Sequence, residues 1–281
     1  MAMLWQAPLA QAQTGLLVIA HGGSATWNEG VRQVVSQVHW DGPIATGFLM
    51  GEAADSEGWA RGVARLVRAG AHDIVVVPLL VSSQGAHYRQ IRFLAGETAH
   101  WPEELTQHSH PAGEPPPVPM RVTPALDDAP ELAAALTGRW AALSEADRRR
   151  PLVLVAHGPN SDAEAVLWIR NLQPAADALR NAGGIPVEIG LLRDDAPVAI
   201  RSAAIAGLRS LIEGLAQQAQ DSVAVLPVLI SSGTIDRKTI PRDLAGLPVR
   251  YTPAPLAPLA PLARWIERMA RAGRPIQSSP R

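Results

Sequence analysis

Short apolar runs alternate with longer amphipathic stretches along the whole chain. The runs at 16–20 and 152–156 are too short for helices and rich in branched side chains, as is typical of strands buried on both faces of a parallel sheet. Further strands are predicted at 44–50, 74–83, 120–123, 187–192, 223–232 and 249–252, and amphipathic helical segments at 28–38, 56–69, 130–143, 163–182, 197–216 and 259–272. This alternation predicts parallel sheets flanked by helices.

The same pattern occurs twice, and the two copies share sequence as well as layout. GLLVIAHG at 15–22 returns as PLVLVAHG at 151–158, IVVVPLLVSS at 74–83 returns as VAVLPVLISS at 223–232, and RVTPA at 121–125 returns as RYTPA at 250–254. Matched segments in the same order indicate a tandem duplication. We therefore predict an α/β protein of two similar domains, 15–143 and 151–272, each a four-stranded parallel sheet. A Pro-rich surface loop is predicted at 106–119 and a polar linker at 144–150.

Composition narrows the chemistry. The chain has no cysteine, which excludes disulfides, thiolate metal sites and cysteine nucleophiles, and its net charge of −1 gives no basic surface for nucleic acid. No apolar run is long enough to span a bilayer, so no membrane partner is expected. The apolar, Ala-rich leader at 1–13 fits either a trimmed export signal or a cytosolic leader. We expect a cytoplasmic protein, with a periplasmic location as the alternative.

Two histidines are the strongest candidates for chemistry. His21 ends the first strand and is followed by two glycines, and His87 comes shortly after the third strand. Ligands of open parallel sheets bind beyond the carboxyl ends of the strands, so both imidazoles should meet at one edge. Such a pair suits divalent Fe, Co, Ni or Zn. No G-x-S-x-G, G-x-G-x-x-G or P-loop motif accompanies them, which leaves hydrolase, dinucleotide and P-loop functions without support.

The AHG of the first strand and the P-L-x-x-S-S-x-G-x-H of the third resemble the CbiX/SirB type of class II tetrapyrrole chelatases in their long, tandem form. The resemblance covers nearly the whole chain. It implies insertion of a divalent metal, Co²⁺ or Fe²⁺ with Ni²⁺ or Zn²⁺ as further choices, into a tetrapyrrole such as sirohydrochlorin, in a cleft between two lobes. It implies no organic cofactor, and a tandem would supply in a monomer what a single unit builds as a homodimer.

On this resemblance, His21 and His87 capture the metal and remove pyrrole protons. The family commonly has Phe-Leu-Glu after the second strand, but here Met50 stands at the glutamate position, so Glu52 is the proposed substitute, with Glu29 as another carboxylate. Arginines near the expected edge could pair with substrate carboxylates, although a solvated surface position is favoured for most of them. The candidates for substrate binding are Ser82, Ser83, Arg89, Arg92, Arg193 and Arg237, with Arg242 nearby. Ser82 and Ser83 also fit simple strand ends.

The second copy departs from the first. His157 repeats His21, but Asp236 stands where His87 would recur. We expect His157 to be a further metal ligand lining the opposite wall of one shared cleft, while a separate His157/Asp236 site stays open. The loop histidines His100, His108 and His110 could also collect metal, but a solvated loop is favoured. A non-catalytic metal- or tetrapyrrole-binding protein is the alternative function.

Overall fold

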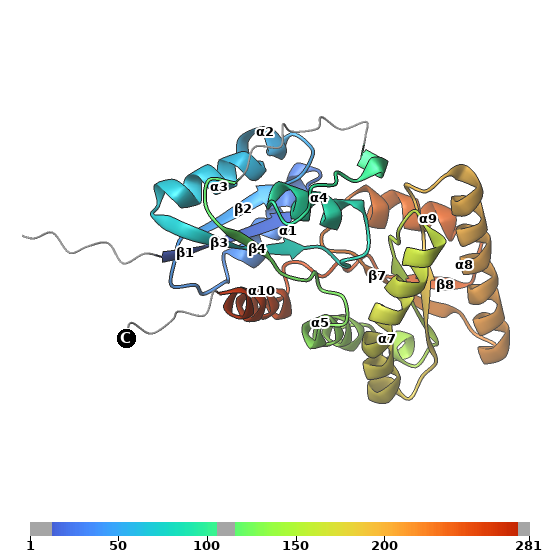
Figure 1. Ribbon diagram of the computed structural model, residues 1–281. Coiled ribbons are helices and arrows are strands. Elements are labelled where there is room, and N and C mark those ends of the chain that lie inside the picture. The colour runs from blue at the N-terminus through green and yellow to red at the C-terminus, as the bar shows by residue number, and fades with distance from the viewer. Residues whose placement is uncertain (1–12, 106–115, 275–281) are drawn as a thin grey trace, which may run out of the picture.

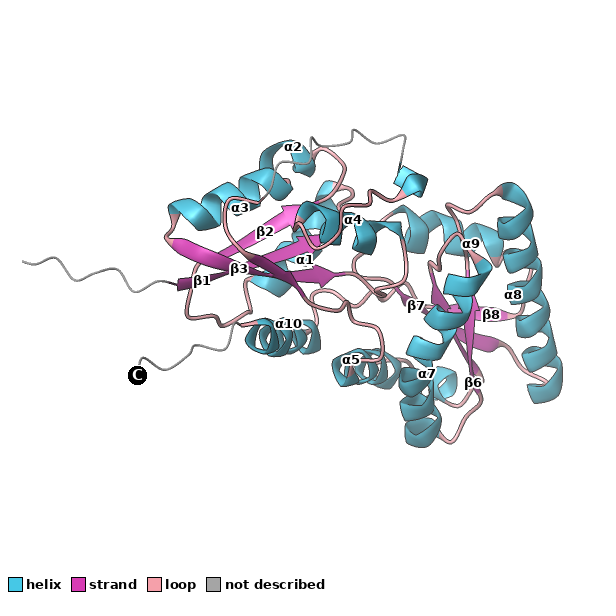
Figure 2. Ribbon diagram, viewed as in Figure 1, coloured by secondary structure: helices cyan, strands magenta, loops and turns pink. Residues whose placement is uncertain are grey.

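The computed structural model describes residues 13–105 and 116–274. Two parallel four-stranded sheets form two lobes (Figures 1 and 2). The sheet of the first lobe has the order β2-β1-β3-β4, and that of the second lobe has the matching order β6-β5-β7-β8. The strands are β1 (Gln13–Ala20), β2 (Ile44–Phe48), β3 (Ala71–Leu79), β4 (Met120–Val122), β5 (Leu152–Ala156), β6 (Val187–Leu191), β7 (Val223–Val228) and β8 (Val249–Tyr251). The predicted fold class and repeat are confirmed.

Helices fill the connections between strands, as the crossover rule for parallel sheets requires. In the first lobe they are α1 (Ala25–Val35), α2 (Ala53–Glu57), α3 (Trp59–Arg68), α4 (Ala86–Leu94) and the 3₁₀ turn Glu103–Leu105; in the second they are α7 (Asp162–Gly183), α8 (Val198–Ala219), a π-helical turn (Ile235–Thr239) and α9 (Ile240–Asp243). The helix predicted at 56–69 is broken at Gly58, whose extended backbone separates α2 from α3. The linker predicted at 144–150 contains a one-turn helix, α6 (Glu145–Arg148), capped by the Ser144 hydroxyl.

The closing helices of the two copies change places. Helix α5 (Pro130–Ala141) follows the first sheet in sequence but packs against α7 of the second lobe. Helix α10 (Ala260–Gly273) ends the second copy but packs against β3 and α1 of the first lobe, and Figure 1 shows it beneath the first sheet. A cation–π contact supports this arrangement, since the guanidinium carbon of Arg274 lies 3.9 Å from the ring centre of Trp40. The sequence domains 15–143 and 151–272 are therefore interlocked in space.

One apolar core runs through both lobes. Alternate residues of β1 point to opposite faces of its sheet, so Leu16 and Val18 pack inward whereas Leu17 and Ile19 pack against α3 and α4. The inward side chains join those of β5, α5, α7 and α10 in a single buried cluster. Separate, smaller clusters cover the outer face of each sheet. The two lobes are therefore joined by their main core and not by a flexible linker.

The closing helices also meet each other through an ion pair that makes stability depend on pH. Arg268 of α10 donates to both carboxylate oxygens of Glu131 at 2.7 Å, and this hydrogen bond lowers the pKa of Glu131 below its usual value. A depressed pKa contributes stability above the unfolded value and loses it as the pH falls. We expect urea titrations to show stability falling below pH ~4.3. Because Arg268 is half exposed, the contribution should be about 1 kcal/mol or less. A Glu131→Gln variant with an unchanged acid limb would contradict this.

No helix within 13–105 and 116–274 has the length and apolar character needed to cross a bilayer. The predicted leader lies outside the described residues except for Gln13, which begins β1. Most of the predicted Pro-rich loop, with His108 and His110, also lies outside them, whereas the exposed His100 lies within.

Candidate metal site

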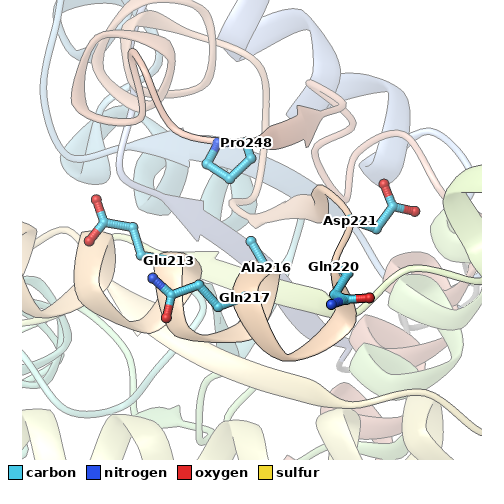
Figure 3. A pocket seen from close by; sticks show the side chains of 6 residues that line it. All are labelled: Glu213, Ala216, Gln217, Gln220, Asp221 and Pro248. Atoms are coloured by element: carbon cyan, nitrogen blue, oxygen red, sulfur yellow. The ribbon is translucent and has the colours of Figure 1, made fainter.

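Two pockets on the surface lie at opposite ends of the strands, and neither contains the histidine pair. One pocket of about 410 Å³ is lined by Glu213, Ala216, Gln217, Gln220, Asp221 and Pro248 (Figure 3). Asp221 lies two residues before β7 and Pro248 one residue before β8, so this pocket lies at the amino ends of the strands, opposite the edge where parallel sheets bind ligands. A second hollow of about 540 Å³ lies between the start of α1 and Ser231–Ser232 of the second lobe, at the carboxyl edge. Neither of these two is lined by His21 or His87.

His21 and His87 come together at the carboxyl edge of the first sheet. His21 follows the last residue of β1, and His87 is the second residue of α4. Their ring centres lie 4.5 Å apart with the planes nearly perpendicular, at 88°. The predicted convergence of these two histidines is confirmed. Trp27 of α1 flanks the pair, with its ring centre 6.4 Å from that of His21.

Each imidazole is oriented through its Nδ1 atom. His21 Nδ1 lies 2.8 Å from the carbonyl oxygen of Gly22, and His87 Nδ1 lies 3.0 Å from Oε1 of Gln90. Carbonyl oxygens only accept, so the neutral rings carry their protons on Nδ1 and their lone pairs on Nε2. An oriented Nε2 lone pair is the form of histidine that binds a metal or takes up a proton. Gln90 is buried, which fixes the ring of His87 from inside α4.

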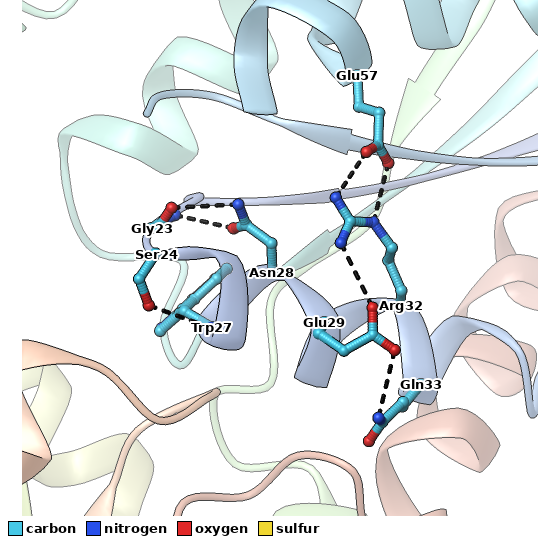
Figure 4. A network of polar contacts seen from close by, with 8 residues as sticks. All are labelled: Gly23, Ser24, Trp27, Asn28, Glu29, Arg32, Gln33 and Glu57. Carbon is cyan, nitrogen blue, oxygen red and sulfur yellow. Dashed lines mark hydrogen bonds and ion pairs between the residues drawn. The ribbon is translucent and has the colours of Figure 1, made fainter. Parts of the chain in front are cut away.

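Asn28 holds the turn that carries His21, and the sequence analysis missed it. Its buried side chain accepts from the Gly23 N–H at 2.9 Å and donates to the Gly23 carbonyl at 3.1 Å (Figure 4). Ser24 caps α1 by accepting from the N–H of Trp27. The signal for Asn28 was weak, since a polar residue in a first helical turn is commonplace. Glu29, a candidate carboxylate, instead bonds Arg32 and Gln33 on its own helix.

Gly22 makes the turn after His21 possible. Its φ is +94°, and a Cβ atom there would lie 2.2 Å from the backbone oxygen of Met50. We expect Gly22→Ala to lower the free energy of unfolding by more than the ~1–2 kcal/mol of left-handed backbone strain alone, and to displace His21. Gly70→Ala is the matched control, because Gly70 has a φ of +92° but no atom within 4 Å of the added Cβ. Equal urea midpoints for the two variants would contradict the clash.

The loop before His87 is tied down by a carboxylate that the sequence did not single out. Asp127, just after β4, accepts from the Ser82 hydroxyl at 3.2 Å, the Ser83 N–H at 2.8 Å and the Ser83 hydroxyl at 2.5 Å. Asp127 has a φ of +43°, and its own N–H donates to Val81. The two serines are thus engaged in ordering the loop, which favours the strand-end interpretation over direct substrate binding.

Glu52 and His157, which were predicted to assist the histidine pair, are less favourably placed. Within the described residues, no three His, Asp or Glu side chains are grouped to hold a metal ion, so neither Glu52 nor His157 completes such a group with the pair. Glu52 is exposed at the start of α2. Met50 touches the site through its backbone, donating its N–H to the His21 carbonyl at 3.0 Å. The catalytic role of Glu52 and the metal-binding role of His157 stay predictions.

The second lobe repeats the histidine turn but not the pair. His157 Nδ1 lies 2.9 Å from the Gly158 carbonyl, and its Nε2 lies 3.4 Å from Asp195. Asp236, aligned with His87, is completely buried, and its carboxylate accepts from the Ser232 hydroxyl and the Gly233 N–H at 2.7 and 2.6 Å. Both of its oxygens serve the loop, so this conformation gives a His157/Asp236 metal site no support.

The candidate arginines are mostly paired within the chain. Arg89 bridges Glu104 and Glu164, and Arg92 donates to Glu97 at 3.1 Å. Arg193 is 8% exposed and donates to the Pro159 carbonyl and to Asp162, while its Nη2 atom is buried without a hydrogen-bond partner. Exposed Arg237 donates to the Ser232 hydroxyl at 2.9 Å beside the inter-lobe hollow. Substrate contact is thus best supported for Arg237, and Arg242 is paired with Asp243.

Comparison with known proteins agrees with this architecture. The CbiX family model matches residues 15–143. The sirohydrochlorin chelatase SirB from Bacillus subtilis subspecies spizizenii, in complex with cobalt, is similar with a TM-score of 0.64 and 16% identity over 93% of this chain and 95% of that chain. SirB from Bacillus subtilis with Fe³⁺ gives 0.62 and 16%, with the same coverage. CbiX, the terminal enzyme for siroheme biosynthesis in denitrifying bacteria, gives 0.52 and 16%, over 93% and 100%. No curated protein matches the sequence.

Proposed function

We propose that this protein inserts a divalent metal into a sirohydrochlorin-type tetrapyrrole, because residues 15–143 match the CbiX family model and the whole chain has the fold of the sirohydrochlorin chelatases. The observation that carries the proposal is the His21–His87 pair, with ring centres 4.5 Å apart at the carboxyl edge of the sheet. We place the reaction in the cytoplasm of the cell and assign it to a monomer.

Metallation of a tetrapyrrole requires two functions of the His21–His87 pair. Metallation releases two protons from pyrrole nitrogens and transfers an incoming ion from water to the ring. The Nε2 lone pair of a neutral imidazole can bind the ion or accept a proton. The Nδ1 hydrogen bonds of His21 and His87 hold both lone pairs in fixed directions. A site built on these two histidines leaves most of the ion's coordination to other groups, such as water or substrate, which eases the release of the ion to the macrocycle.

Cobalt and iron are the proposed metals. The support is that related SirB structures were obtained with cobalt and with Fe³⁺. Two imidazoles bind Co²⁺, Fe²⁺, Ni²⁺ and Zn²⁺ in a common affinity order, so competition among metals must decide the preference. No organic cofactor is invoked by this chemistry.

An anaerobic assay tests the function. Purified protein is incubated with sirohydrochlorin and Co²⁺, Fe²⁺ or Ni²⁺, and the absorbance change of the macrocycle is followed. We expect a rate well above the protein-free control with Co²⁺ or Fe²⁺. A rate equal to that control for every metal would reject chelatase activity. Tight binding of metal or tetrapyrrole without turnover would instead support the non-catalytic alternative, which Met50 in place of a glutamate favours.

A further inference from the structure

The loop that carries His87 is held from the second lobe as well as from its own. Asp127 gathers Ser82 and Ser83, as described above, and a fourth hydrogen bond reaches the same carboxylate from Asn171 of α7, whose Nδ2 lies 3.0 Å from Asp127 Oδ1. Trp168 of α7 adds a bond from its indole Nε1 to the Gln84 carbonyl at 2.5 Å. Gln84 lies three positions before His87.

These contacts come from one stripe of a single helix. Glu164, Trp168 and Asn171 are spaced i, i+4 and i+7, which places them on one face of α7. Glu164 pairs with Arg89, two residues beyond His87. The stripe therefore contacts the chain before His87 and after it. Trp168 is buried, and Asn171 donates a hydrogen bond to Asp127 of the other lobe, so both residues contribute to the contact between the lobes.

The two lobes hold the loop after their third strand in different ways. Asp127 and Ala257 occupy matched positions, since each donates its N–H to the strand-end residue of its own sheet, Val81 or Ile230. In the second lobe the loop is closed from within by Asp236, and the matched position holds Ala257. In the first lobe His87 stands where Asp236 would be, and the carboxylate has moved to Asp127. The loop that carries His87 thus has no carboxylate of its own and is tied by Asp127 from the segment after β4, which α7 contacts through Asn171.

We propose that α7 of the second lobe is a positioning element for the metal site of the first, with Asn171 and Trp168 as positioning residues for His87. Asn171 fixes Asp127, Asp127 fixes Ser82 and Ser83, and Trp168 fixes the Gln84 carbonyl. The second lobe then serves the reaction without a metal site of its own. This inference rests on the proposed function of the His21–His87 pair, and it assigns a task to the degenerate copy.

Two substitutions remove single contacts and keep the helix. Asn171→Ala deletes the donor to Asp127, and Trp168→Phe keeps an aromatic ring while deleting the indole N–H. Each should reduce kcat/KM for sirohydrochlorin metallation by about tenfold, mainly through kcat, and weaken Co²⁺ binding by ~10-fold, as is typical of residues that orient ligands from outside. Asn171→Asp should do more, because it sets a second carboxylate against Asp127. Asn171→Gln, which keeps the amide donor, should recover part of the loss.

Arg268→Ala is the matched control, since it removes a contact between the closing helices away from the loop. We expect it to leave kcat/KM and Co²⁺ affinity near wild type. Equal losses in Asn171→Ala and Arg268→Ala, or no loss in either loop variant, would overturn the positioning role. Wild-type protein that fails to metallate sirohydrochlorin but binds Co²⁺ would reject the proposed function alone, and the Co²⁺ titrations of the variants would still decide the positioning role. Protein that binds no Co²⁺ would overturn both.

Discussion

Replacement of His87 with alanine is expected to lower kcat/KM for sirohydrochlorin metallation by ~10²- to 10⁴-fold, the usual range for loss of a positioned acid–base group. His21→Ala should have an effect of similar size. The double variant should lose little more than either single variant, because two groups that act as a unit are not additive. The reason is geometric: the two rings lie in contact, and one imidazole alone cannot both hold the ion and accept protons.

His72→Ala is the matched control for this series. His72 is an exposed histidine on β3, where its Nδ1 bonds the Gln13 carbonyl near the opposite end of the sheet. Its variant should keep the wild-type rate. His87→Ala with an undiminished rate would remove that residue from the site, and a His72→Ala loss of equal size would show that the assay follows stability and not chemistry.

Trp265→Ala should have the largest effect on stability. Trp265 in α10 is fully buried in the core cluster that joins the two lobes. Truncation of a buried tryptophan typically costs ~3–5 kcal/mol, through lost burial and the cavity left behind. Because α10 belongs to the second copy in sequence and packs on the first sheet, the loss should shift one shared unfolding transition. Circular dichroism and near-ultraviolet absorbance in urea should report the same midpoint.

Trp59→Ala is the comparison, since Trp59 in α3 is only partly buried and borders the outer cluster of the first lobe. Its cost should be clearly smaller. Two separate transitions in Trp265→Ala or in the wild type would contradict a core shared between the lobes.

Much of the fold could be predicted because the repeat provides two sequences for each strand and helix. Apolar runs such as 16–20 and 152–156 have too few residues for anything but buried strands, and β1 and β5 lie there. The exchange of α5 and α10 could not be predicted, since both helices present an apolar face that would suit either sheet. The hydrophobic pattern of a helix shows which of its faces is buried, but it does not show which element packs against that face.

The site was predictable where chain position alone decides it. His21 and His87 follow β1 and β3, which are neighbours in the sheet, so their meeting follows from topology. Asn28 and Asp127 were missed because their roles depend on hydrogen bonds to particular backbone atoms. The asymmetry at Asp127 appears only when the hydrogen bonds of the two copies are matched, because the RVTPA and RYTPA segments place Leu256 opposite Asp127 without a gap.

The central claim is that two lobes share one principal metal site, and Co²⁺ stoichiometry tests it most directly. Anaerobic titration of the purified protein, followed by the ligand-field absorbance of Co²⁺, should give one tightly bound ion per chain. That ion should be lost in both His21→Ala and His87→Ala, and a weaker affinity in His157→Ala would identify His157 as the further ligand that the sequence predicts. Two equivalent ions per chain, or an ion that survives in the double variant of His21 and His87 and disappears in His157→Ala, would contradict the account.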